Sequence, residues 1–122
     1  MTSVIVDSNI WIQHLKGGLE PLKELLKDGL VLVHPFVRQE LACGRLKGRD
    51  EFLSLLEDLP RATVGTDEEF YFFLNRHSLF EKGLGFVDIH LLMSARLMRA
   101  ELWTRDKALN RAATGLRVDY TK

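Results

Sequence analysis

Carboxylates follow two of the most apolar segments of the chain. Asp7 comes directly after the aliphatic run Val4–Val6, and Asp106 follows the apolar segment of residues 101–104. A carboxylate at the end of a buried strand is costly to desolvate unless a cation or hydrogen bonds compensate its charge. Capping of the following helix explains Asp7 as well as a catalytic or metal-binding role does, and it explains Asp106 better than such a role does. Neither residue therefore defines a site when it is taken singly.

Two further acids lie in apolar helical segments. Asp88 falls in the first turn of the segment GLGFVDIHLLMSA, where it could simply complement the helix dipole. Its neighbours Phe86 and Ile89 predict that this turn is covered, and a covered carboxylate favours a nearby cation. Glu40 lies mid-helix in VRQELACG, for which an exposed glutamate is the simple explanation.

The interpretation changes if all four acids meet. Like charges ~4 Å apart repel by a few kcal/mol per pair at an effective dielectric constant near 20, and such a group protonates or binds a cation. Oxygen ligands without an accompanying cysteine or histidine set suit Mg²⁺ or Mn²⁺ better than Zn²⁺. Such ions act most often on phosphate esters. The candidate metal ligands are Asp7, Glu40, Asp88 and Asp106.

The elements that must position these acids alternate along the chain. Continuous apolar runs predict strands over residues 3–6, 30–33, 61–64, 101–104 and 117–120. Helical periodicity and end signals predict helices over residues 8–16, 20–28, 36–46, 49–59, 66–83, 86–100 and 106–113. This alternation is typical of an α/β fold whose parallel sheet is covered on both faces. In such sheets ligands bind beyond the carboxyl ends of the strands, where Asp7 and Asp106 are expected.

Length and charge set the outer bounds. The 122 residues predict one domain spanning residues 1–122. The 17 basic and 17 acidic residues balance, so a nucleic-acid site would have to come from local clustering. Cys43 is the single cysteine, which excludes an intrachain disulfide. Without a signal-like leader or an apolar run of about 20 residues, we expect a cytoplasmic protein with no membrane association.

Four motifs in this order resemble those of the PIN-domain ribonucleases, and among them the VapC toxins of prokaryotic toxin–antitoxin pairs. The motifs are VDSNIWI, QEL, FVDIHLLMSA and LWTRD, and the resemblance extends from Val4 to Val118. It implies a PIN-like three-layer α/β/α fold with a five-stranded parallel sheet of order 3-2-1-4-5. It also implies an Mg²⁺- or Mn²⁺-dependent endoribonuclease that hydrolyses RNA phosphodiesters.

The same resemblance assigns roles and partners. The family's catalytic, metal-binding acids correspond to Asp7, Glu40, Asp88 and Asp106. The polar residue after the fourth strand corresponds to Thr104, and Ser8 or Asn9 could assist at the first strand. A homodimer is implied, as is a VapB-type antitoxin whose tail covers the acidic pocket.

Contacts with RNA and with partners are predicted from local clusters. Arg105 and Lys107 flank Asp106 and are the strongest candidates for binding RNA phosphates, and Arg38 is a further candidate. For most cations of the chain, however, a solvated surface position is the simpler explanation. The segment of residues 70–74, FYFFL, is apolar nearly all round and suggests a partner surface, with Trp11 and Phe36 as additional candidates.

Other functions stay open at this point. A PIN nuclease could act in RNA maturation or surveillance, and a PIN-like protein could bind RNA or a partner without catalysis. Aspartyl-phosphate phosphotransfer domains also place acids at strand ends. A haloacid-dehalogenase-type enzyme would need an aspartate where Asn9 stands, and a receiver domain would need an early pair of adjacent acids.

Overall fold

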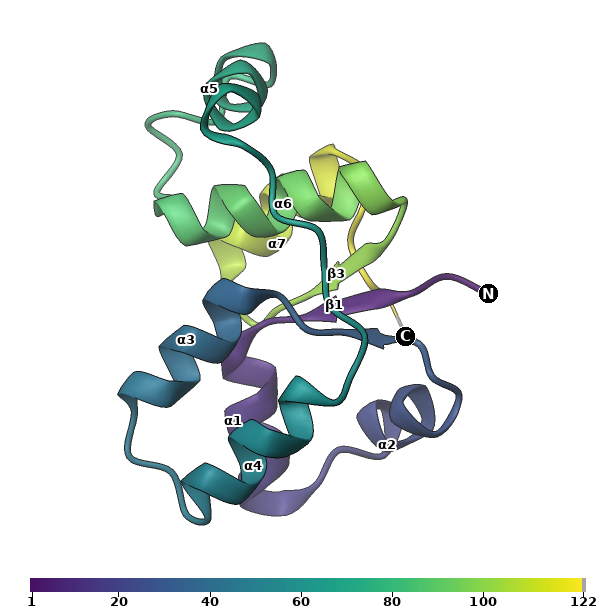
Figure 1. The fold of residues 1–122 in the computed structure, drawn as a ribbon. Helices are drawn as coiled ribbons and strands as arrows, with labels where there is room; N and C mark the ends of the chain where they lie inside the picture. Colours follow the sequence, from purple (N-terminus) through teal and green to yellow (C-terminus); the bar gives the residue numbers. More distant parts are fainter. Residues whose placement is uncertain (122) are drawn as a thin grey trace.

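A computed structural model describes residues 1–121 as alternating strands and helices (Figure 1). In chain order the elements are β1 (Val4–Val6), α1 (Ser8–Gly17), α2 (Glu20–Lys27), β2 (Val31–Leu32), α3 (Pro35–Cys43), α4 (Arg49–Glu57), α5 (Asp67–Arg76), α6 (Phe86–Met98), β3 (Glu101–Trp103) and α7 (Lys107–Gly115). Within residues 1–121, every helix is too short or too polar to cross a membrane.

The strands form a parallel sheet of order β2-β1-β3. Val4 pairs with Val31 on one side and with Glu101 on the other, so the central strand is β1. Figure 1 shows α5, α6 and α7 over one face of this sheet and α1 to α4 over the other. The three-layer arrangement explains the aliphatic strands, because a sheet covered on both faces has no solvated side.

Over the described residues 1–121 the sheet has three strands, and the expectation of five was wrong. The outermost predicted strands survive only as single parallel bridges, Val33 with Arg61 and Leu102 with Asp119. These bridges lie on the outer sides of β2 and β3, where the order 3-2-1-4-5 would put the two missing strands.

Local bonding explains why both edges stop after one bridge. At one edge the carbonyl of Thr63 accepts from the Ser94 hydroxyl at 2.6 Å, so this segment is bound to α6 rather than to a neighbouring strand. Pro60 has no N–H to donate to a ladder. At the other edge Arg117 adopts a left-handed conformation (φ 60°), which interrupts extended backbone.

Helix α5 is shorter than predicted. It begins after the expected capping box, in which Thr66 and Glu69 exchange hydrogen bonds of 2.8 and 3.1 Å. It ends at Arg76 rather than near residue 83, because Ser78 turns into the left-handed region (φ 50°). The buried side chain of Leu79 anchors the irregular segment that follows, residues 77–85. Similarly, α3 ends at Cys43, three residues before its predicted end.

The core is centred on β1 and α6. Residues 89–95 of α6 are all buried, as the apolar sequence of this helix predicts. Ile5, Leu92 and Leu102 are fully shielded from solvent. Trp11 is also in the core, with 2% of its surface exposed, so its suggested place on a partner surface was wrong.

Candidate active site

Asp7 occupies the carboxyl end of the central strand, with 6% of its surface exposed. It is the N-cap of α1, and its Oδ1 accepts a hydrogen bond from the Ser8 N–H at 2.7 Å. Its Oδ2 accepts from the hydroxyl of Thr104, also at 2.7 Å. The carboxylate is thus fixed by both neighbouring elements, which compensates the cost of its burial.

Asn9 and Thr104 connect the ends of β1 and β3. The Thr104 Oγ1 accepts from the Asn9 amide at 3.2 Å and from the Asp106 N–H at 3.1 Å. The Asn9 Oδ1 in turn accepts from the backbone N–H of Arg105 at 3.1 Å. This network sets the position of the loop that carries Asp106 relative to Asp7.

Two other aspartates also hold helix N-termini. The Oδ1 of Asp106 accepts from the Leu109 N–H at 2.9 Å, and the Oδ2 of Asp88 accepts from the Gly85 N–H at 2.9 Å. The capping role weighed from the sequence is therefore real for Asp7 and Asp106, and Asp88 also binds a backbone N–H at the start of its helix. It does not exclude a second role, because the cap bonds of Asp88 and Asp106 each use one of the two carboxylate oxygens. Figure 1 shows the start of α6 on the same side of the molecule as the β1–α1 junction.

The four acids influence one another electrostatically. Partial burial raises the pKa of Glu40, and the charges of Asp7 and Asp88 raise it further, against the nearby hydroxyl of Ser8. Burial likewise raises the pKa of Asp88, with added repulsion from Asp7 and Asp106, against the bond from Gly85. The structure thus brings these acids from four segments to one edge of the sheet.

The donor set fits a divalent cation in type and charge. It offers only carboxylate, hydroxyl and amide oxygens, the ligands of Mg²⁺ and Mn²⁺. Burial first, and then repulsion between the acids, raises the pKa values of Glu40 and Asp88, and a cation would relieve the repulsion. The spacing, however, is not that of a closed cage. Across residues 1–121, no three His, Cys, Asp or Glu side chains lie close enough together to hold an ion as they stand.

The three candidate RNA-binding cations differ in their surroundings. Arg105 and Lys107 are exposed on either side of Asp106. Arg38 is held elsewhere, because its Nε donates to the Leu53 carbonyl at 3.2 Å and its guanidinium lies 3.8 Å from Glu57. Two of the three predicted RNA-binding cations, Arg105 and Lys107, therefore lie next to an acid of the candidate site.

Gln13 is a residue that the sequence analysis missed. Its Oε1 accepts from the Arg105 guanidinium at 2.8 Å, which holds this cation against α1. Asn9, which receives the backbone of the same arginine, is four residues earlier and lies on the same face of the helix. In the sequence, the signal that could have identified Gln13 was this i, i+4 spacing of two amide side chains shortly after Asp7.

Comparison with known proteins identifies the family of the chain. The PIN domain family model matches residues 4–115. The chain is 44% identical over 110 residues to the curated Ribonuclease VapC32 of Mycobacterium tuberculosis, with 89% of each chain covered. In fold it is similar to a chain of a toxin–antitoxin complex from Klebsiella pneumoniae, with a TM-score of 0.69, 21% identity and coverage of 98% of this chain and 97% of that one. It is also similar to FitAcB from Neisseria gonorrhoeae, with a TM-score of 0.59, 15% identity and coverage of 91% and 93%. The chain belongs to the PIN-domain family and, within it, to the VapC ribonucleases.

Proposed function

We propose that this protein is the endoribonuclease toxin of a type II toxin–antitoxin system, acting on RNA phosphodiesters in the cytoplasm. The observation that carries the proposal is the 44% identity to Ribonuclease VapC32 across 89% of both chains. The group of mutually repelling acids at the carboxyl edge of the sheet supports it, since PIN-type hydrolysis depends on acids at this place.

We assign the binding of Mg²⁺ or Mn²⁺ to the acidic group, whose members are Asp7, Glu40, Asp88 and Asp106. When bound, such an ion supplies activation of water and neutralisation of charge at the phosphodiester. The four carboxylates bind it in their ionised form, so the charge of the ion offsets the repulsion that they exert on one another in its absence.

The polar residues around Asp7 act by positioning. The Thr104 hydroxyl and the Ser8 N–H fix both oxygens of this carboxylate, so the oxygens keep one orientation toward the substrate. Asn9 joins Thr104 to the backbone of Arg105. Such supporting bonds hold reacting groups within the narrow geometry that catalysis requires.

We assign contacts with RNA phosphates next to the acidic group to Arg105 and Lys107. Both are exposed, and Gln13 holds the Arg105 guanidinium in place. Arg38 is left out of this role, since the carbonyl of Leu53 and the carboxylate of Glu57 already bind it.

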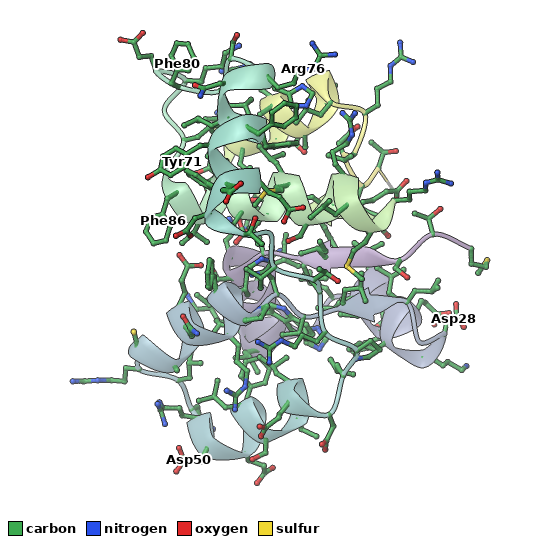
Figure 2. The ribbon with its side chains drawn as sticks, turned by 45° about the horizontal axis from the view of Figure 1, so that its top comes forward. Asp28, Asp50, Tyr71, Arg76, Phe80 and Phe86 are labelled. Atoms are coloured by element: carbon green, nitrogen blue, oxygen red, sulfur yellow. The ribbon has the colours of Figure 1, made fainter. Side chains whose placement is uncertain are left out.

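An antitoxin and a second copy of the chain are the proposed partners. Large apolar side chains are exposed on and after α5: Tyr71 at 63%, Phe72 at 69%, Phe80 at 52% and Phe86 at 66%. Figure 2 shows Tyr71, Phe80 and Phe86 along one edge of the molecule. Exposed apolar patches of this kind are typical of interaction surfaces. The VapC relationship supports a VapB-type antitoxin as one occupant.

The deciding experiment is sequencing of RNA ends after induction of the wild-type chain and of Asp7→Asn in cells, with in vitro cleavage of total RNA as a second readout. We expect new ends only with the wild type, and in vitro only with Mg²⁺ or Mn²⁺. Equal cleavage by Asp7→Asn would overturn the nuclease assignment. Growth arrest that co-expression of the neighbouring antitoxin gene relieves would identify a toxin, whereas specific trimming without arrest would identify a maturation nuclease.

A further inference from the structure

A hollow of about 570 Å³ lies between α7 and the irregular segment of residues 77–85. We call it the basic hollow, and its lining residues are His77, Leu79, Lys82, Ala108, Arg111, Ala112, Gly115 and Leu116. Among the described residues 1–121, no carboxylate lines it, in contrast to the acidic group. Its volume is in the range of small-ligand sites in proteins.

The cations of the basic hollow lack carboxylate partners. Lys82 and Arg111 are exposed, and neither takes part in any ion pair found within residues 1–121. Burial and the charges of Arg96 and Arg76 lower the pKa of His77. The charged side chains that line the basic hollow are thus cationic, which favours an anionic ligand.

The rest of the lining leaves room for more than an anion. The floor on α7 is built from small residues, including Ala112 and Gly115, so no long side chain fills the space. Leu79 supplies an apolar wall, and the His77 ring, packed edge-on against Phe73 at 4.7 Å, offers a flat surface. Cations beside apolar and flat surfaces suit a nucleotide, whose phosphate is charged and whose base can stack on a histidine.

The two segments that form the walls of the basic hollow, α7 and residues 77–85, each have one end next to the acidic group. Helix α7 begins at its cap Asp106, and the segment of residues 77–85 ends at Gly85, whose N–H binds Asp88. Lys107 and Arg111 are four residues apart and share one face of α7. Arg111 is about 7.5 Å along the helix axis from Asp106, at 1.5 Å per residue. That distance corresponds to about two nucleotides of a stacked strand.

We propose that the basic hollow is a subsite for the RNA strand, in which Lys82 and Arg111 bind a phosphate about two nucleotides from the cleaved bond. The sugar or base of that nucleotide lies against His77 and Leu79. This inference rests on the proposed function, because it identifies where the substrate of the acidic group continues along the surface.

The test is the salt dependence of binding of a labelled 12-nucleotide single-stranded RNA to the protein in Mg²⁺, with Asp7→Asn present to prevent cleavage. Each lost phosphate contact reduces the slope of log K against log salt by about 0.7 for a single strand. Lys82→Gln with Arg111→Gln removes the single phosphate contact proposed here, so it should reduce the slope by about 0.7 and weaken binding several-fold. The matched control is Lys27→Gln with Arg99→Gln, which lie four and two residues before β2 and β3, at the opposite edge of the sheet. Equal effects of the two pairs, or no effect of either, would overturn the subsite.

A second variant tests the hollow without changing charge. A side chain at Gly115 meets no atom within 4 Å at its Cβ, and this position lines the basic hollow. Gly115→Phe should therefore fold and occlude the space, weakening RNA binding several-fold, while Gly115→Ala leaves it open. Unchanged RNA binding by a folded Gly115→Phe protein would contradict the subsite.

Cleavage by the protein with Asp7 intact separates this inference from the proposed function. If the wild type cleaves RNA and the Lys82 and Arg111 pair of substitutions leaves KM unchanged, the subsite alone fails. If the wild type cleaves no RNA with Mg²⁺ or Mn²⁺, the proposed function fails, and the subsite fails with it as a site for substrate.

Discussion

The hydroxyl of Thr104 donates a 2.7 Å hydrogen bond to the Oδ2 of Asp7, although the two residues are 97 positions apart. Both side chains are buried, at 8% and 6% exposure. The bond joins the carboxyl ends of two adjacent parallel strands, β1 and β3. It is the direct link between the central acid of the site and the loop that carries Asp106.

Replacement of Thr104 by valine tests this link. Thr104→Val keeps the shape but removes the donor to Asp7 and the acceptor of two further bonds. We expect a loss of about 1–3 kcal/mol in the free energy of unfolding and a drop of about 10–100-fold in RNA cleavage. Urea unfolding and cleavage assays measure the two effects. Thr104→Ser is the control and should retain most of both, so equal losses in the two variants would contradict a role for the hydroxyl.

The two roles of Asp7 separate in a pair of substitutions. Asparagine still caps α1, so Asp7→Asn should keep the stability of the wild type within about 1 kcal/mol, whereas Asp7→Ala loses about 1 kcal/mol more. Both should reduce cleavage by more than about 100-fold, because the charge is lost in each. Thermal unfolding and RNA cleavage, run on the same samples, distinguish the roles. Residual cleavage that follows stability rather than charge would show that Asp7 is only a cap.

Burial of His34 predicts a stability change in mild acid. Its Nδ1 accepts from the Phe36 N–H at 3.0 Å, and its side chain is fully buried. Burial lowers the pKa of His34 from 6.5 to about 4, with smaller effects from His90 and Arg61. The unfolded chain binds the proton more tightly between these values, so stability is present above pH 6.5 and is lost as the pH falls toward 4.

The measurement is urea unfolding between pH 7 and pH 4 for the wild type and for His34→Asn, which can still cap α3. The stability of the wild type should fall by up to about 3 kcal/mol more than that of the variant over this range. The carboxylates titrate in both proteins, so the difference isolates the histidine. Parallel pH profiles would show that burial does not lower the pKa of His34.

The centre of the fold follows from sequence patterns, and its edges do not. The aliphatic runs that became β1 and β2 are continuous because both faces of the sheet are covered. Residues 61–64 have an equally extended pattern, but the Ser94 hydroxyl binds the carbonyl of Thr63 and diverts the segment to α6. That competition comes from a residue 31 positions away, which no local pattern contains.

The candidate site, too, could be predicted from the sequence only in part. The acids were identifiable because carboxylates at strand ends and in apolar helices contradict simple burial rules. The pairing of Arg38 with the Leu53 carbonyl depends on how α3 packs on α4, and the hold of Gln13 on Arg105 depends on how α1 meets the end of β3. Which cations remain free for RNA is therefore a property of tertiary packing.

Glu40 gives a test in which the sign of the effect reverses with a divalent cation. Its pKa is raised by burial and by Asp7, so the folded chain binds its proton more tightly than the unfolded chain does. Without cations, stability from this group is present below its ordinary pKa of 4.5 and is lost as the pH rises through the raised value. At neutral pH in EDTA, Glu40→Gln should therefore be as stable as the wild type or more stable, by less than about 1 kcal/mol.

Addition of Mn²⁺ should invert this order. A cation that binds only the folded chain stabilises it by about 2.7 kcal/mol at 100 times its Kd, and Glu40→Gln removes one of its charged ligands. The Tm of the wild type should rise with Mn²⁺ and exceed that of Glu40→Gln. The control Glu24→Gln removes the same charge from the exposed surface of α2 and should follow the wild type. If Mn²⁺ raises the Tm of the wild type and of Glu40→Gln equally, the ion binds without Glu40, and the acidic group has one ligand fewer than proposed.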